Sequence, residues 1–401
     1  MPEVKPEIET FAKIKVIGVG GSGGSAVNRM IVSKIKGVEF IAINTDVQAL
    51  HHNEAKTKLH IGQATTKGLG AGMNPEVGLM AAQENINDIR DLLKGADMVF
   101  ITCGLGGGTG TGASPVVATV AKELGALVVA VVTKPFAFEG AQRNAIAERG
   151  FQDLKDRVDT IITIPNDKIL HMVDKKTPLL EAFGTVDDVL RQGVQGISEL
   201  ITIPGLINVD FNDVKAVMQD AGSALMGIGE ASGEGRSMAA AKMAISSPLL
   251  DLSIDGARGI LFIIVGGPSM AMSEVEEAAT IITESVDPNA KIIFGAVIDE
   301  DMKDKIRITV VAAGFGDKEP RHSTSFDDSK YSINRLFSKK NLEEKIEEAR
   351  GQQRVEPRRE ELPQPAPRPI MPSASVPAGQ FKPKSEDEDL EIPAFIRKKM
   401  K

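Results

Sequence analysis

The chain has 401 residues, enough for about two or three domains, with a formal net charge of −8 and a single cysteine. The acidic balance argues against a protein body that binds nucleic acid, and one cysteine excludes an internal disulfide framework. No apolar run approaches the roughly 18 residues that a membrane-spanning helix needs.

The first segments predict a nucleotide-binding unit. Residues 1–11 are acidic and lack a secretion signal, so we expect a disordered lead and a cytoplasmic protein. A strand over 13–18 runs into the glycine turn Gly18–Gly23, with the spacing G-x-G-x-x-G, and then into a helix over 24–33 and a strand over 40–46. This order is typical of dinucleotide-binding domains, so a Rossmann-type NAD(P)-dependent oxidoreductase is one hypothesis.

Two more glycine-rich loops favour a different ligand. Lys67–Gly72 precedes a helical run over 75–93, and Gly104–Gly112 holds six glycines in nine residues. The second loop follows an apolar strand over 98–102 and leads into a helix over 113–122 with Pro115 in its first turn. Without Cβ atoms, successive N–H groups can converge on an anion at the helix N-terminus. Three such loops and no Gly-Lys-Ser/Thr triplet predict a nucleotide polyphosphate held by backbone amides.

Further strands over 127–133 and 160–167 extend the predicted parallel sheet. Between them Glu139 and Arg143 lie four residues apart, and this spacing alone predicts an ordinary ion pair. A long amphipathic helix over 179–201 is expected to pack between two domains. By pattern alone, Phe183 on its apolar stripe is a core residue and Asp187, off the stripe, is solvated.

The second half predicts a smaller mixed sheet with helices packed on it. Its strands are expected over 223–229, 258–265, 291–298 and 305–314, and its helices over 211–219, 235–246 and 273–285. Asp210 is a good N-cap for the first of these helices, and Asp213 follows three residues later on the same face. This half contains no His cluster, Cys pair or Ser/His arrangement, so no metal site is predicted from side chains.

The C-terminal region changes character. Residues 317–385 are charged and then proline-rich, which predicts a disordered linker. Residues 386–401 place apolar side chains between an acidic and a basic block. A short apolar segment at the end of a long polar linker is typical of a peptide that binds a partner protein, and a frayed tail is the alternative.

Taken together, these motifs resemble the tubulin/FtsZ family of GTPases. Gly104–Gly112 is similar to the tubulin signature, and the resemblance covers residues 12–316 almost continuously. The tail over 390–397 is similar to the family's partner-binding peptide. The implied fold is α/β, with a Rossmann-like parallel-sheet GTPase domain (12–177), a long central helix (178–204), a smaller mixed-sheet second domain (205–316) and a disordered C-terminal tail.

The resemblance also implies roles for individual residues. Nucleotide binding is implied for Gly20, Gly21, Ser22, Gly23, Gly24, Ser25, Asp46, Ala71, Gly72, Gly104, Gly107, Gly108, Thr109, Gly110, Thr111, Glu139, Arg143, Asn166, Phe183 and Asp187. Of these, Glu139 and Arg143 would contact the ribose, and Asn166, Phe183 and Asp187 would contact the guanine. Asn208, Asp210 and Asp213 would form the hydrolytic loop. Ser22 interrupts a glycine run, and Ser25 stands where the family often has Asn, so we expect at most a shifted affinity.

The implied activity is hydrolysis of GTP to GDP and phosphate with Mg²⁺, coupled to a filament that forms the bacterial division ring at mid-cell. The tail would bind membrane-tethering and regulatory division proteins, with no nucleic-acid partner and no direct membrane insertion. Given these assignments, Asp187 and Asp213 lie at opposite ends of one helix, at least ~20 Å apart along its axis. If both act on GTP, the acidic loop must reach the nucleotide of the next subunit, and such a head-to-tail contact builds a filament.

Overall fold

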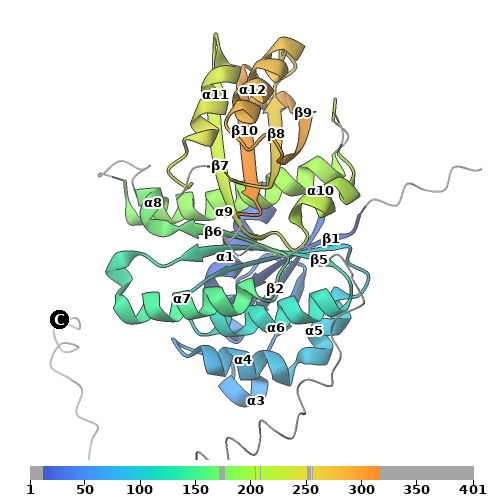
Figure 1. The fold of residues 1–401 in the computed structure, drawn as a ribbon. Coiled ribbons are helices and arrows are strands. Elements are labelled where there is room, and N and C mark those ends of the chain that lie inside the picture. The colour runs from blue at the N-terminus through green and yellow to red at the C-terminus, as the bar shows by residue number, and fades with distance from the viewer. Residues whose placement is uncertain are drawn as a thin grey trace, which may run out of the picture. The chain divides into compact units, whose positions relative to one another are not determined.

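A ten-stranded sheet runs through the described part of the chain, in the order β3-β2-β1-β4-β5-β6-β7-β10-β8-β9 (Figure 1). The structure is a computed structural model that describes residues 12–170, 177–203, 205–207, 209–250, 254 and 256–315. The predicted lead (1–11), linker (317–385) and tail peptide (386–401) lie outside the described residues. All described residues belong to one compact unit, residues 1–321.

The first six strands are parallel and have the order of a Rossmann sheet. They are β1 (Ile14–Val19), β2 (Val38–Asn44), β3 (Thr57–His60), β4 (Met98–Gly104), β5 (Leu127–Lys134) and β6 (Thr160–Pro165). The two central strands β4 and β5 are almost wholly buried, as their continuous apolar sequences require when helices cover both faces. The predicted parallel-sheet domain is therefore confirmed, and the short strand β3 is an addition to it.

Helices cover both faces of this sheet. In the first half these are α1 (Gly20–Val32), α2 (Val47–His51), α3 (Gln63–Thr66), α4 (Pro75–Glu84), α5 (Ile86–Leu93), α6 (Thr109–Glu123), η1 (Ala137–Glu139), α7 (Ala141–Lys155), α8 (Asn166–Leu170) and α9 (Leu179–Thr202). Helices α4 to α7 lie together on one side of the sheet (Figure 1), and their apolar side chains form one core with that face. Helices α1 and α9 contribute apolar side chains to a separate core.

Three predicted boundaries in this half are wrong. Helix α1 begins at Gly20 rather than at residue 24, so most of the first glycine turn is the helix's first turn. Helix α6 begins at Thr109 rather than at residue 113, which places Pro115 inside the helix. The run over 75–93 is two helices that meet at Asn85. The side chain of Asn85 accepts a hydrogen bond from Gly62 N (2.9 Å), and this contact with another segment holds the break.

The second half is a mixed sheet with helices packed on it, as predicted. Its elements are α10 (Phe211–Met218), β7 (Gly222–Ser232), α11 (Arg236–Ile245), β8 (Gly259–Gly266), α12 (Met272–Glu284), β9 (Lys291–Ile298), η2 (Glu300–Met302) and β10 (Lys305–Ala313). Strand β10 is antiparallel to β7 and β8, while β8 and β9 are parallel. The sheet is not separate, because Thr160–Ile162 of β6 pair with Gly222–Ala224 of β7 and join the two halves.

Helix α9 packs between the two halves. Its apolar stripe, from Val186 to Leu200, belongs to a core that includes Val131 of β5 and Ile263 of β8. The helix has 24 residues, which corresponds to about 36 Å of length. Within the described ranges, no helix combines enough length and hydropathy to span a bilayer.

Cys103 lies fully buried in β4, and burial raises the pKa of its thiol to about 11. At pH 8 roughly one thiol in a thousand would then be ionised, and only the thiolate is nucleophilic. We expect a thiol-specific alkylating reagent to modify the folded protein very slowly, and rapidly after denaturation. Labelling followed by intact-mass measurement checks this, and fast labelling of the native protein would show that β4 is accessible.

Candidate nucleotide-binding site

A cleft of about 300 Å³ lies at the carboxyl edge of the parallel strands. This edge is where open α/β sheets bind ligands, because strand ends and helix N-termini meet there. The lining residues are Val19, Gly21, Ser22, Gly72, Gly104, Leu105, Gly107, Gly108, Thr109, Gly110, Thr133, Pro135, Glu139, Arg143, Asn166, Phe183, Val186, Asp187 and Leu190. Segments far apart in the sequence therefore form one site.

Most of the predicted nucleotide-binding residues line this cleft, and the others lie around it. Gly20, Gly24 and Ser25 line a neighbouring cavity of about 270 Å³. Gly23 packs against the carbonyl of Thr102, and the side chain of Asp46 caps the N-terminus of α2. Ala71 is buried beside Gly108, and Thr111 lines a different cavity. The remaining lining residues were not predicted, because each reads as an ordinary core or strand-end residue in the sequence; they are Val19, Leu105, Thr133, Pro135, Val186 and Leu190.

The loop Gly104–Gly112 divides its backbone N–H groups between the protein and the cleft. The N–H groups of Gly104, Leu105, Gly106 and Gly108 donate to Ser22 Oγ, Thr133 O, Thr111 Oγ1 and Gly72 O, at 2.7 to 2.9 Å. The N–H groups of Gly107, Thr109 and Gly110 have no protein acceptor among the described residues. Since these three residues line the cleft, their donors are available to an anion there, next to the N-terminus of α6.

The glycine-rich loops contact one another closely. Gly20 has φ +74°, and a Cβ there would lie 2.9 Å from Gly110 N. A Cβ at Gly108 would lie 2.6 Å from Gly72 O. The hydroxyls of Thr45 and Thr109 are 2.6 Å apart and share a hydrogen bond. The loops therefore form one cradle whose walls are backbone, and side chains at these glycines would force them apart.

The other end of the cleft holds an amide, an aromatic and an acidic side chain. Asn166 is buried, and its Oδ1 has no partner in the described part of the chain. Phe183 is 42% exposed, with its ring edge-on to Phe136 at 5.5 Å. Burial raises the pKa of Asp187 to about 6, while the Arg29 guanidinium acts in the opposite direction. The pattern-based expectations are thus wrong: Phe183 is not core, and Asp187 is half-buried because α9 turns this end toward the cleft.

Glu139 and Arg143 form the ion pair that their spacing predicted, at 2.7 Å. Glu139 also accepts a hydrogen bond from Phe136 N (3.0 Å), which fixes its carboxylate at the cleft wall. Arg143 Nε is buried and has no partner within the described ranges. The pair therefore offers a carboxylate and an unused N–H donor to a polar ligand between the two ends of the cleft.

The acidic loop lies elsewhere. Asp210 caps α10 by accepting a hydrogen bond from Asp213 N (2.9 Å), as predicted. Both aspartates are exposed and neither lines the cleft. From Asp187 to the end of α9 at Thr202 the helix rises about 22 Å. Asn208 lies outside the described residues. The structure thus separates the predicted hydrolytic loop from the cleft within one chain.

Two family models match the chain. The GTPase domain of the tubulin/FtsZ family matches residues 13–174, and the C-terminal domain of the FtsZ family matches residues 222–316. The same residues that suggested a Rossmann-type oxidoreductase match the GTPase model, so the oxidoreductase hypothesis is not supported.

Solved structures agree with these matches. The chain is similar to FtsZ from M. jannaschii, solved as an empty dimer, with 48% identity, a TM-score of 0.74, and coverage of 76% of this chain and 89% of the other. A point mutant of that protein gives the same identity and TM-score, with 92% of its chain covered. CetZ2 from Haloferax volcanii, a GTPγS-bound protofilament, shares the fold at 20% identity and a TM-score of 0.67, with 84% and 99% covered.

M. jannaschii is archaeal, so these matches establish the family without the bacterial origin that the resemblance suggested. Identity near one half extends over both halves of the fold, and the glycine loops of the cleft lie inside the matched GTPase domain. The chain therefore belongs to the FtsZ family of tubulin-like GTPases and is a GTPase.

Proposed function

We propose that this chain binds GTP in the cleft, polymerises head to tail, and hydrolyses GTP when the acidic loop of the next subunit completes the site. The observation that carries the proposal is the position of the cleft and the acidic loop at opposite ends of α9. A contact between two different faces of one protein does not close on itself and so builds a filament. The solved dimer of M. jannaschii FtsZ and the CetZ2 protofilament support such an assembly.

In this proposal the phosphates lie on the backbone N–H groups of Gly107, Thr109 and Gly110. The ribose lies beside Glu139 and Arg143, and the guanine lies between Asn166, Phe183 and Asp187. The other predicted nucleotide-binding residues shape the loops from behind or from the neighbouring cavity. An ionised Asp187 would accept hydrogen bonds from guanine N–H groups, which adenine does not present in the same arrangement.

Hydrolysis would proceed by attack of water on the γ-phosphate. The carboxylates of Asp210 and Asp213, together with Asn208, would orient and polarise that water from the neighbouring subunit. Mg²⁺ would neutralise phosphate charge, and it commonly takes one or two carboxylates with phosphate oxygens and water as its other ligands. The described residues contain no group of three metal-ligating side chains, so phosphate oxygens would supply much of its coordination.

Exposed apolar side chains near both faces support the head-to-tail contact. Leu69 is 86% exposed in the loop that contributes Gly72 to the cleft, and Phe138 is exposed next to Glu139. Leu206 is 69% exposed a few residues before Asp210. Burying large apolar groups drives protein association, so contact between these faces would remove them from water.

We further propose a cytoplasmic protein that forms a division ring at mid-cell. Its functional divisions would be 12–177 for GTP, 178–204 for the central helix and 205–316 for the acidic loop and second sheet. Residues 317–385 would link this body to a peptide at 386–401 that binds membrane-tethering and regulatory division proteins.

The Asp213→Ala variant tests the role of the acidic loop. We expect it to bind GTP and to assemble normally, but to release phosphate about 100-fold more slowly, as when one polarising group is removed from an active site. Because Asp213 bonds to Asp210 through its backbone N–H, the substitution leaves the α10 cap intact. Nucleotide binding, light scattering and phosphate release are measured together, with Asn212→Ala on the same exposed turn as control. Loss of GTP binding would contradict the proposal.

The pKa of Asp187 predicts how GTP affinity depends on pH. Below about pH 6 the carboxyl takes up a proton and loses an acceptor, so affinity should fall about tenfold from pH 7 to pH 5. The phosphates of GTP also titrate and affect the pH dependence of binding. Asp187→Asn serves as the control, because the phosphates affect both proteins equally and only the unmodified protein has the Asp187 carboxyl. Fluorescent-nucleotide titrations should show weak binding and a flatter pH profile for the variant. Equal pH profiles for the two proteins would exclude Asp187 from base recognition.

A further inference from the structure

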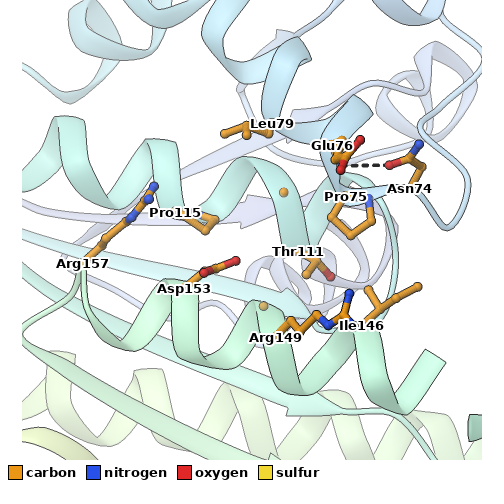
Figure 2. Close-up of a pocket in the computed structure, with 12 residues that line it drawn as sticks. Asn74, Pro75, Glu76, Leu79, Thr111, Pro115, Ile146, Arg149, Asp153 and Arg157 are labelled. Atoms are coloured by element: carbon orange, nitrogen blue, oxygen red, sulfur yellow. Dashed lines mark hydrogen bonds between the residues drawn. The ribbon is translucent and has the colours of Figure 1, made fainter. Parts of the chain in front are cut away.

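A second cavity, of about 530 Å³, lies behind the phosphate-binding loop, between α4, α6 and α7 (Figure 2). Its lining includes Pro75 and Leu79 of α4, Pro115 of α6 and Ile146 of α7. Thr111 also faces this cavity and does not line the nucleotide cleft, although the loop it belongs to lines that cleft. The two sides of one loop therefore face two different spaces.

The hydroxyl of Thr111 holds the loop from this rear side. Thr111 is 3% exposed, and its Oγ1 accepts the N–H of Gly106 at 2.9 Å. Gly106 has φ +96°, and a Cβ there would lie 2.9 Å from the Cγ and the carbonyl oxygen of Arg143. Gly106 is thus fixed between Thr111 and α7. Its N–H is therefore used within the protein, whereas the next N–H, that of the cleft-lining Gly107, has no protein acceptor among the described residues.

The methyl group of Thr111 packs against α7. Gly150 is buried on that helix, and a Cβ at Gly150 would overlap Thr111 Cγ2. The hydroxyl and the methyl share one Cβ, so any rotation of χ1 that moves the methyl also moves the hydroxyl away from Gly106. The missing side chain at Gly150 is therefore the space that allows Thr111 to keep its hydrogen bond.

We propose that Thr111 is a positioning residue of the GTPase: it fixes the phosphate-binding conformation of Gly104–Gly112 from the rear, with Gly150 as the space that sets its rotamer. In this proposal the side chain of Thr111 supports the loop and does not itself contact the nucleotide, for which the resemblance implied a binding role of this residue. The inference rests on the proposal that the cleft binds GTP.

Four variants test this arrangement. Thr111→Ser keeps the hydroxyl and removes the methyl, whereas Thr111→Val keeps the shape and leaves Gly106 N–H without an acceptor. In Gly150→Ala the new methyl group forces Thr111 to rotate. Because alanine favours a helix more than glycine does, this substitution should not weaken α7 through helix propensity. The double variant Thr111→Ser with Gly150→Ala restores space for the new methyl while the hydroxyl remains. Asp153→Ala is the control, because Asp153 lines the same cavity and, within the described ranges, forms no hydrogen bond or ion pair with the loop.

Equilibrium titrations with GTP, and competition by GMP, measure the effect. We expect Thr111→Val and Gly150→Ala to bind GTP about tenfold or more weakly, while the smaller contact with GMP changes little. Thr111→Ser, the double variant and the control should bind GTP within about threefold of the unmodified protein. Thermal unfolding of the same samples establishes that each variant is folded.

Recovery in the double variant is the decisive result, since a general loss of stability would add across the two substitutions. Tight GTP binding by Gly150→Ala, or no recovery in the double variant, would overturn the inference. If Gly150→Ala does not fold, equal GTP affinity of Thr111→Val and Thr111→Ser would overturn it. Failure of the unmodified protein to bind GTP would instead contradict the proposed function.

Discussion

The length and rigidity of α9 constrain the rest of the molecule. One end of this helix brings Phe183 and Asp187 to the cleft, and the chain that leaves its other end leads to the acidic loop before α10. Apolar contacts with both halves of the sheet hold it along its length. A helix packed in this way does not bend by the roughly 20 Å needed to bring its ends together. The separation is therefore a property of the fold, and under the proposed mechanism the acidic loop would act on the nucleotide of a second molecule.

The chemistry of the cleft comes mainly from backbone groups. Among the described residues no lysine lines it, and its free backbone donors are the N–H groups of Gly107, Thr109 and Gly110 near the start of α6. Backbone donors are directed by loop conformation alone, so the packing behind the loop determines where these N–H groups point. We therefore expect the contacts among the glycine loops, and those between Gly106, Thr111 and α7, to influence nucleotide binding.

Glycine spacing and apolar runs predicted the parallel sheet, the central helix and the glycine-rich loops, because these patterns report local structure directly. The individual cleft residues were implied by the resemblance to the tubulin/FtsZ family. The sequence placed the starts of two helices four residues too late, whereas the structure begins them at Gly20 and Thr109. Glycines that read as loop residues allow close packing here within the first turn of a helix. Asp187 and Thr111 show a second limit. Whether a side chain faces a cleft, a core or a rear cavity depends on neighbouring elements such as α7, and one chain's periodicity does not contain that information.

Mixing two inactive variants tests the divided active site most directly. Asp213→Ala keeps an intact cleft, and Asp187→Ala keeps an intact acidic loop, so each alone should release little phosphate. In a mixed filament, some Asp187→Ala subunits present their acidic loop to the GTP of an Asp213→Ala subunit. Such an interface combines an intact cleft with an intact acidic loop, so its active site is complete. We predict that mixing the two restores a substantial fraction of the unmodified rate, with a maximum near equal amounts. Phosphate release that stays at the sum of the two separate rates would contradict hydrolysis between subunits.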